Sequence, residues 1–386
     1  MPVRTPDGTE VLAELTMQLG PRPATSTAEA IAAAQINARL RQAGFSVDTR
    51  SLPTVAHPGG RFVPVAVALM AAITITAWQP VIGAIIGLWL MILMVVDALF
   101  SPLPAFRQRH MSQNIIAARS IEGAATESPA QPQWRLVILA PLDTPPVWRG
   151  LARLIAPTSE GLLFRLVLSG LPVMVAAGIA VWPTLRWLLT LTALTGALLL
   201  LWATRRPLPL MQPDGGLAAL ATLTVAAQQL PRLHYVEVWA VAIGAAHCGQ
   251  NGINTLMARY PFEPEHTLVI GLGPLASGQL AIISRDGILR HETADPFLVR
   301  LAMTADRADP VIDLEPRALT ARDELLSTLR QRGFRTLGIR AVPNRSTTHN
   351  PQLVERAARL IVAIVQALET ETNNDLSVSR TQRTGN

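Results

Sequence analysis

Apolar residues follow two different patterns along this chain. Most of the sequence places short apolar runs between polar segments, but two blocks, Phe62–Phe100 and Leu162–Ala203, are almost continuously apolar. No charged residue occurs from Val63 to Val96 or from Leu166 to Leu185. A membrane-spanning helix needs roughly 20 apolar residues to cross a hydrocarbon core of about 30 Å, so each block is long enough to cross twice.

A turn signal lies near the middle of each block. Trp78-Gln79-Pro80 divides the first block, and Trp182-Pro183-Thr184 divides the second. We therefore predict two helical hairpins with four membrane spans, at about 62–78, 80–100, 164–182 and 185–203. The tryptophans near the predicted ends are typical of an aromatic belt at a membrane surface. The alternative, a pair of buried core helices, is disfavoured because uncharged stretches of this length are uncommon in soluble domains.

The remaining sequence alternates strand and helix patterns. Short apolar or alternating runs predict strands near 45–48, 114–118, 135–140, 236–243, 267–271, 280–284 and 337–342. Helical periodicity predicts helices over 9–44 with an interruption near 20–23, and over 215–230, 294–305, 319–332 and 351–368. This order indicates a layered α/β sheet. We assign 1–61, 101–161 and 204–369 to one discontinuous α/β domain, 62–100 and 162–203 to the transmembrane hairpins, and 370–386 to a disordered tail.

The net charge of +6 is carried by arginine, since the chain contains no lysine. These arginines gather beside the apolar blocks and form no basic stripe with aromatic residues, which argues against nucleic acid as a partner. By the positive-inside rule they place the polar domain in the cytoplasm. We therefore expect a multi-pass integral membrane protein whose first partner is the lipid bilayer. The single cysteine, Cys248, excludes an internal disulfide.

Several polar segments carry a resemblance to a known family. They are Leu19-Gly20-Pro21-Arg22-Pro23, Gln113–Ala117, Leu139–Thr144, Gly216–Leu220, Gly244–Gly252 and His349-Asn350-Pro351. In order and spacing they resemble the co-catalytic zinc aminopeptidases, metallopeptidase family twenty-eight. The resemblance covers nearly all the polar sequence and excludes both hairpins. It implies a three-layer, mixed-sheet aminopeptidase-like domain into which the two hairpins are inserted.

The resemblance also implies where a zinc site would lie. Such a site needs histidine and carboxylate ligands, one bridging carboxylate and a general base. The family's first histidine ligand falls on Pro141, its orienting aspartate on Asp143, and its bridging aspartate on Gln212, unless a shortened loop brings Asp214 there. Its base falls on Ala246, and its remaining ligands fall on His247, Gly273 and His349. We call these eight residues the zinc-site positions.

Most of these positions hold residues that cannot perform the family's chemistry, so the resemblance implies a degenerate, catalytically inactive member without a cofactor. We expect a membrane-anchored pseudopeptidase that binds a lipid headgroup, a peptide or a membrane protein partner. One alternative is a metal-dependent membrane peptidase with a rewired zinc site built from Asp214, His247, His349 and Cys248. A second alternative is a component of a small-solute transporter or channel.

Overall fold

The structure is a computed structural model that describes residues 7–100, 103, 110–121, 132–211, 213–260, 262–342 and 350–384. A nine-stranded mixed sheet forms the centre, in the order β1-β2-β4-β3-β5-β9-β6-β7, with β8 beside β6. The strands are β1 (Ser46–Thr54), β2 (His110–Arg119), β3 (Trp134–Pro141), β4 (Val236–Ile243), β5 (Thr267–Leu272), β6 (Gln279–Asp286), β7 (Glu292–Thr293), β8 (Glu315–Ala318) and β9 (Arg335–Val342).

The four central strands, β4, β3, β5 and β9, run parallel to one another. Their side chains are buried on both faces, because helices cover both sides of the sheet. Leu136 and Ile138 of β3 point into the larger core, whereas Val137 and Leu139 point into the smaller one. The parallel register brings the carboxyl ends of these strands to one edge.

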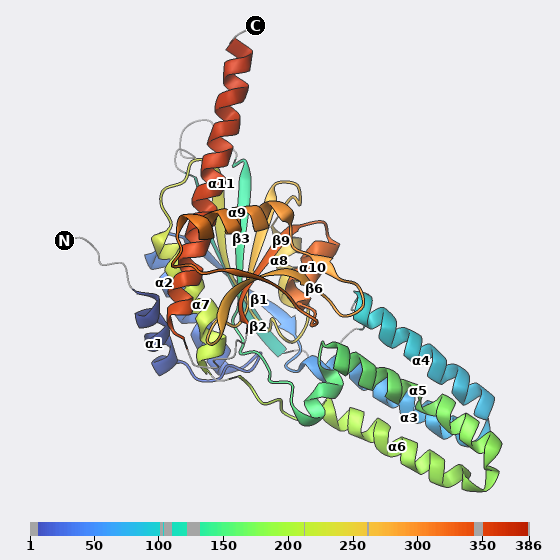
Figure 1. The fold of residues 1–386 in the computed structure, drawn as a ribbon. Helices are drawn as coiled ribbons and strands as arrows, with labels where there is room; N and C mark the ends of the chain where they lie inside the picture. Colours follow the sequence, from blue (N-terminus) through green and yellow to red (C-terminus); the bar gives the residue numbers. More distant parts are fainter. Residues whose placement is uncertain are drawn as a thin grey trace.

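Helices form the two outer layers (Figure 1). The larger core is covered by α1 (Gly8–Gln18), α2 (Thr27–Gln42), α7 (Pro213–Gln229), α9 (Pro296–Ala308) and α11 (Gln352–Thr384). The smaller core is covered by α8 (Asn251–Arg259) and α10 (Glu324–Gln331). This is the mixed α/β sheet architecture that we predicted.

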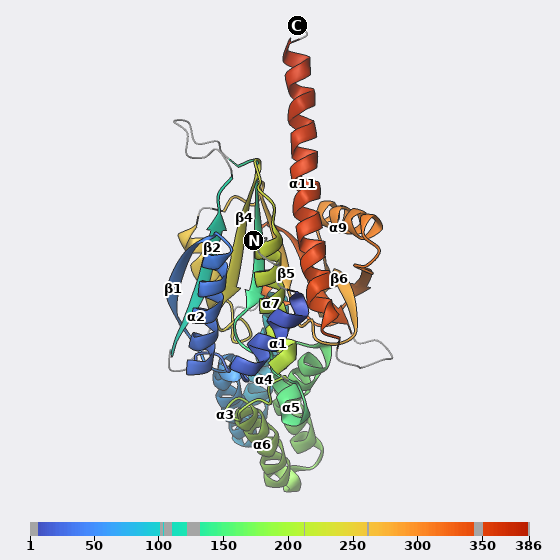
Figure 2. The same cartoon turned by 90° about the vertical axis from the view of Figure 1, so that its left-hand side faces the viewer.

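Four further helices form a bundle that projects from one end of the molecule (Figures 1 and 2). They are α3 (Val63–Trp78), α4 (Pro80–Phe100), α5 (Ser159–Val181) and α6 (Arg186–Ala203). With their adjoining short 3-10 turns, all four are long and apolar enough to cross a membrane. Their ends agree with the predicted spans except that α5 begins at Ser159, because the Thr158 hydroxyl accepts a hydrogen bond from the Gly161 amide and caps the helix there.

Short 3-10 helices join this bundle to the sheet. The first, η1 (Pro58–Phe62), precedes α3, and η2 (Gly150–Ile155) precedes α5. Arg165 of α5 donates hydrogen bonds to the carbonyls of Leu154 and Ala156, and its guanidinium lies 4.7 Å from the Phe62 ring centroid. These contacts hold both connections against the base of the bundle.

The end of the chain differs from the prediction. We expected residues 370–386 to be disordered, but α11 continues to Thr384 and projects from the end opposite the bundle (Figure 2). The Glu369 carboxylate accepts hydrogen bonds from the amides of Tyr235 and Val236, and Thr372 is buried. These contacts anchor the helix beyond its last predicted residue.

Candidate functional site

Asp143 lies directly after β3, at the edge of the sheet where the parallel strands end. Its side chain is 1% exposed. One oxygen accepts a hydrogen bond from the Ala246 amide at 2.9 Å, and the other accepts from the His247 amide at 3.0 Å. The His247 ring nitrogen Nδ1 lies 3.1 Å from Asp143 Oδ1. The carboxylate therefore holds the loop after β4 through its backbone and orients the His247 ring.

A second buried carboxylate, which we did not predict to be part of this site, holds the same loop. Glu29 accepts hydrogen bonds from the Ala245 amide at 2.7 Å and from the Thr25 amide at 2.6 Å. Ser112 donates to it from β2. Ser26 caps α2 by accepting a hydrogen bond from the Glu29 amide, which is a contact within the first turn of the helix. That local pattern contains no signal for the contact with Ala245, which lies 216 residues away.

The loop after β4 is held at four successive residues. Asn114 of β2 accepts a hydrogen bond from the Gly244 amide at 3.0 Å and donates one to the Gly252 carbonyl. Ala245 has a φ of 49°, a left-handed conformation that costs energy for a residue with a side chain. Side-chain acceptors on the amides from Gly244 to His247 compensate for that cost and make this loop rigid.

Arg22 balances the two carboxylates. It is fully buried, and its Nε donates to the Leu142 carbonyl at 2.8 Å. Burial lowers its pKa to about 10, against the opposing effects of Asp143 and Glu29. Burial also raises the pKa of Glu29 to about 7, and the negative charge of Asp143 adds to this shift. The site therefore contains a buried cation that interacts electrostatically with two buried acids.

The zinc-site positions that the structure describes do not fit a pair of zinc ions. Pro141 and Ala246 carry no donor atom, and at Gly273 a Cβ would lie 2.9 Å from Cβ of Arg340. Within the described residues, no three His, Cys, Asp or Glu side chains are grouped so that they could hold a metal. Gln212 and His349 lie outside the described residues, as does the side chain of Asp214 at the start of α7.

Cys248, a member of the alternative ligand set, is buried beside Ala24, Val55 and Ala245. Of that set the structure thus describes only the side chains of His247 and Cys248, which are adjacent in the chain. The rewired zinc site therefore stays a hypothesis.

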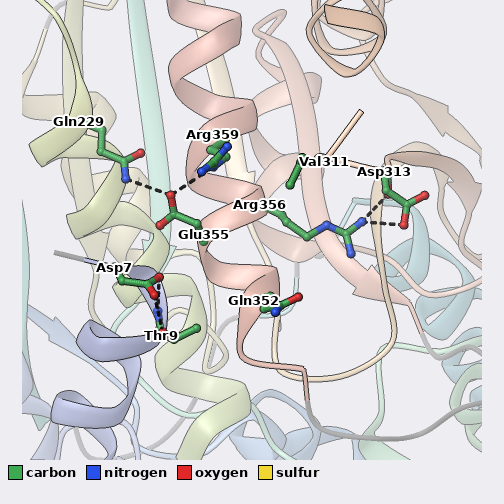
Figure 3. A pocket seen from close by; sticks show the side chains of 9 residues that line it. All are labelled: Asp7, Thr9, Gln229, Val311, Asp313, Gln352, Glu355, Arg356 and Arg359. Atoms are coloured by element: carbon green, nitrogen blue, oxygen red, sulfur yellow. Dashed lines mark hydrogen bonds and ion pairs between the residues drawn. The ribbon is translucent and has the colours of Figure 1, made fainter. Parts of the chain in front are cut away.

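Two cavities lie away from these positions. The first, of about 690 Å³, is bounded by α1, α7, α11 and the segment after α9 (Figure 3). Its charged groups are paired: Arg356 donates to Asp313, Arg359 donates to Glu355, and Gln229 donates to the same carboxylate. Glu355 also accepts a hydrogen bond from the Gly8 amide, so this network anchors α1 to α11.

The second cavity, of about 680 Å³, lies where the end of α4 meets β7, α10 and the start of α9. Phe100, Arg290 and Arg330 contribute to its walls. It adjoins the helical bundle at the end of α4.

Comparison with known proteins identifies the fold. No protein-family model matches the chain, and none of the curated proteins matches it. Among solved structures, BSAP, a zinc aminopeptidase from Bacillus subtilis, is similar with a TM-score of 0.52 at 10% identity, covering 95% of this chain and 96% of that one. An aminopeptidase from Aneurinibacillus sp. strain AM-1 has a TM-score of 0.50 at 12% identity, with 94% of each chain covered. The chain therefore shares the fold of these zinc aminopeptidases.

Proposed function

We propose that the chain is a membrane-anchored, catalytically inactive aminopeptidase-like protein that serves as a binding or scaffold module at the membrane. The observation that carries this proposal is the set of hydrogen bonds that the Asp143 carboxylate accepts. Both of its oxygens accept hydrogen bonds from backbone amides of a rigid loop, while Pro141 and Ala246 offer no ligand or base. A two-zinc hydrolase needs a metal ligand and a general base, and the resemblance places them at these two positions.

The helical bundle supports the membrane part of the proposal. Large apolar side chains cover its outside, including Trp89, Leu88, Met174, Trp187 and Leu191, each at least 54% exposed. Exposed apolar surface on this scale marks an interaction site, and four helices of spanning length point to lipid. Arg205 and Arg206 are exposed where α6 returns to the domain, which favours a cytoplasmic α/β domain.

The test uses the full chain expressed in membranes and then purified in detergent. We expect it to stay in the membrane after alkaline carbonate washing, to purify without stoichiometric zinc, and to release no amino acid from aminopeptidase substrates in added zinc. Extraction by carbonate would contradict the membrane anchor. One bound zinc with peptide hydrolysis would establish the rewired peptidase, and solute flux in liposomes would establish a transporter; either result would overturn the scaffold proposal.

A further inference from the structure

Two connections between the α/β domain and the bundle lie side by side at the base of the bundle. The short helix η2 leads into α5, and residues 204–211 leave the end of α6. The segment before η2 pairs with this second connection. The Val147 amide donates a hydrogen bond to the Pro209 carbonyl at 2.7 Å, and the Met211 amide donates one to the Pro145 carbonyl at 2.9 Å. The pairing joins the start of α5 to the end of α6 on the side of the domain that faces the bundle.

Four exposed arginines lie on these two connections, and we call them the basal arginines. They are, at η2 and after α6, Arg149, Arg153, Arg205 and Arg206. Among the described residues, none of their guanidinium groups has an ion-pair or hydrogen-bond partner. The segments 145–161 and 202–211 contain one carboxylate, Glu160. This surface therefore carries a clear excess of positive charge.

An aromatic side chain indicates where this charge lies relative to the lipid. Trp202, in the last turn of α6, is 52% exposed, and the Arg206 guanidinium lies 5.2 Å from its ring centroid. The preceding turn exposes the apolar side chains of Leu198 and Leu199. Tryptophan at the end of a spanning helix typically lies at the level of the lipid headgroups. Arg206 therefore lies at the height of the lipid phosphates.

The surface needs negative charge from outside the chain. Like charges at close range repel one another, and the described part of the protein supplies the basal arginines with no carboxylate partner. An anionic leaflet supplies that charge, and an arginine near such a surface strengthens the attraction on the order of fivefold. The planar guanidinium also matches the geometry of a phosphate group.

We propose that the basal arginines form a binding surface for anionic phospholipids in the leaflet next to the α/β domain, and that they hold these lipids around the ends of α5 and α6 in preference to zwitterionic ones. The surface is continuous with the apolar outside of the bundle, so its occupant is a lipid of that leaflet and not a soluble anion. This inference rests on the membrane anchoring proposed above.

The experiment reconstitutes the full chain in phosphatidylcholine liposomes and adds spin-labelled phosphatidylglycerol or spin-labelled phosphatidylcholine. Electron paramagnetic resonance separates the lipid that is immobilised by the protein from bulk lipid, and it gives a relative association constant for each probe. We expect phosphatidylglycerol to be preferred about threefold, because the gain at each basal arginine is averaged over boundary positions that lack one. Added sodium chloride should reduce the preference by screening the charges.

Two double variants remove the same charge from different places. Arg205→Gln with Arg206→Gln removes half of the basal arginines and should lower the preference roughly twofold. Arg259→Gln with Arg307→Gln removes two exposed arginines of α8 and α9, which have no part in this surface, and should leave the preference unchanged. Thermal unfolding in detergent establishes that each variant is folded.

Equal immobilisation of the two probes by the unmodified protein would overturn the proposal. A preference that persists in full without Arg205 and Arg206, that the control pair lowers equally, or that salt leaves unchanged would also overturn it. Failure of the membrane anchor is distinguishable, because neither probe would then be immobilised and carbonate would extract the protein.

Discussion

At the scale of single residues, the site is organised around backbone amides. Asp143 and Glu29 come from distant parts of the chain, yet each carboxylate accepts hydrogen bonds from the loop after β4. Buried carboxylates are retained only where charge and hydrogen-bond partners compensate for the loss of water. Here Arg22 and four loop amides provide that compensation, so these acids have a structural use that requires no metal.

Removing Asp143 should therefore destabilise the fold without changing zinc content. Asp143→Ala leaves the Ala246 and His247 amides without their acceptor and removes one of the two negative charges near the buried Arg22, and we expect it to lower the free energy of unfolding by about 3–5 kcal/mol. The exposed control Glu265→Ala should stay within about 0.5 kcal/mol of the unmodified protein. Denaturant unfolding followed by tryptophan fluorescence measures both. A stable Asp143→Ala protein that has lost bound zinc would show that Asp143 serves a metal site.

Glu29 should make stability depend on pH. Its folded pKa of about 7 lies above the ordinary 4.5, so the folded state binds the proton more tightly than the unfolded state. The contribution of Glu29 to the free energy of unfolding should therefore fall as pH rises from about 4.5 to 7, by on the order of 3 kcal/mol. Unfolding measured across this window should show a flatter profile for Glu29→Gln. An unchanged profile would show that Glu29 is ionised throughout.

Part of this site was predictable from sequence. Asp143 follows a strongly apolar run, so its place at a strand end could be predicted. The hydrogen bond from the Ala245 amide to Glu29 could not be predicted, because it depends on how α2 packs across the sheet. Local sequence carries no information about a partner that distant.

At the scale of elements, close packing within the bundle depends on glycine. A Cβ added at Gly83 of α4 would overlap Thr76 Oγ1 and lie 2.8 Å from Thr76 Cα in α3. Thr76 Oγ1 itself donates to the Ala72 carbonyl, so it has little freedom to move away. The two helices of this hairpin therefore approach each other through a position that tolerates no side chain.

Gly83→Ala should consequently destabilise the protein by about 1–3 kcal/mol, although alanine is normally the better helix former. Gly170→Ala in α5 provides a matched control, since its added Cβ would lie 3.4 Å from Met91 Sδ, an ordinary contact. Thermal unfolding in detergent compares the two. Equal stability of both variants would mean that α3 and α4 can move apart to accommodate the added methyl group without losing stability.

The elements differed in how well the sequence predicted them. The hairpin helices were located within a few residues, because long apolar runs ended by Trp-Pro signals define their own ends. We did not predict α8, which begins after Gln250 without a side-chain cap. The extension of α11 was also missed, because residues from 370 onward are polar and show no apolar period. Both helices depend on contacts elsewhere in the fold.

At the scale of the whole molecule, the structure has two opposite ends. The tips of both hairpins lie at one end, and α9 and α11 lie toward the other (Figures 1 and 2). If the bundle spans a bilayer, the tips and the α/β domain must face opposite compartments, and the arginines beside the bundle predict the cytoplasmic side for the domain.

Cysteine labelling tests this arrangement in a Cys248→Ala background. We expect cysteines placed at the exposed tip residues Gln79 and Thr184 to react with an impermeant maleimide from outside intact cells. Cysteines placed at the exposed residues Glu265 and Arg307 should react only after the cells are opened. Labelling of all four positions from the same side would contradict the spanning arrangement.

The two hairpins occupy connections between strands that pair with each other. Thr54 at the end of β1 pairs with His110 at the start of β2, and the second hairpin lies between β3 and β4. Closing an unstructured loop of the first hairpin's length would cost roughly 3–4 kcal/mol of chain entropy. The first hairpin returns to its starting side, so it brings the end of β1 and the start of β2 together, whereas β3 and β4 are parallel and their connection must also cross back over the sheet. We therefore expect pairing of β1 with β2 to be favoured once the first hairpin has formed, and a chain in which that hairpin fails to form to be impaired in assembling this edge of the sheet.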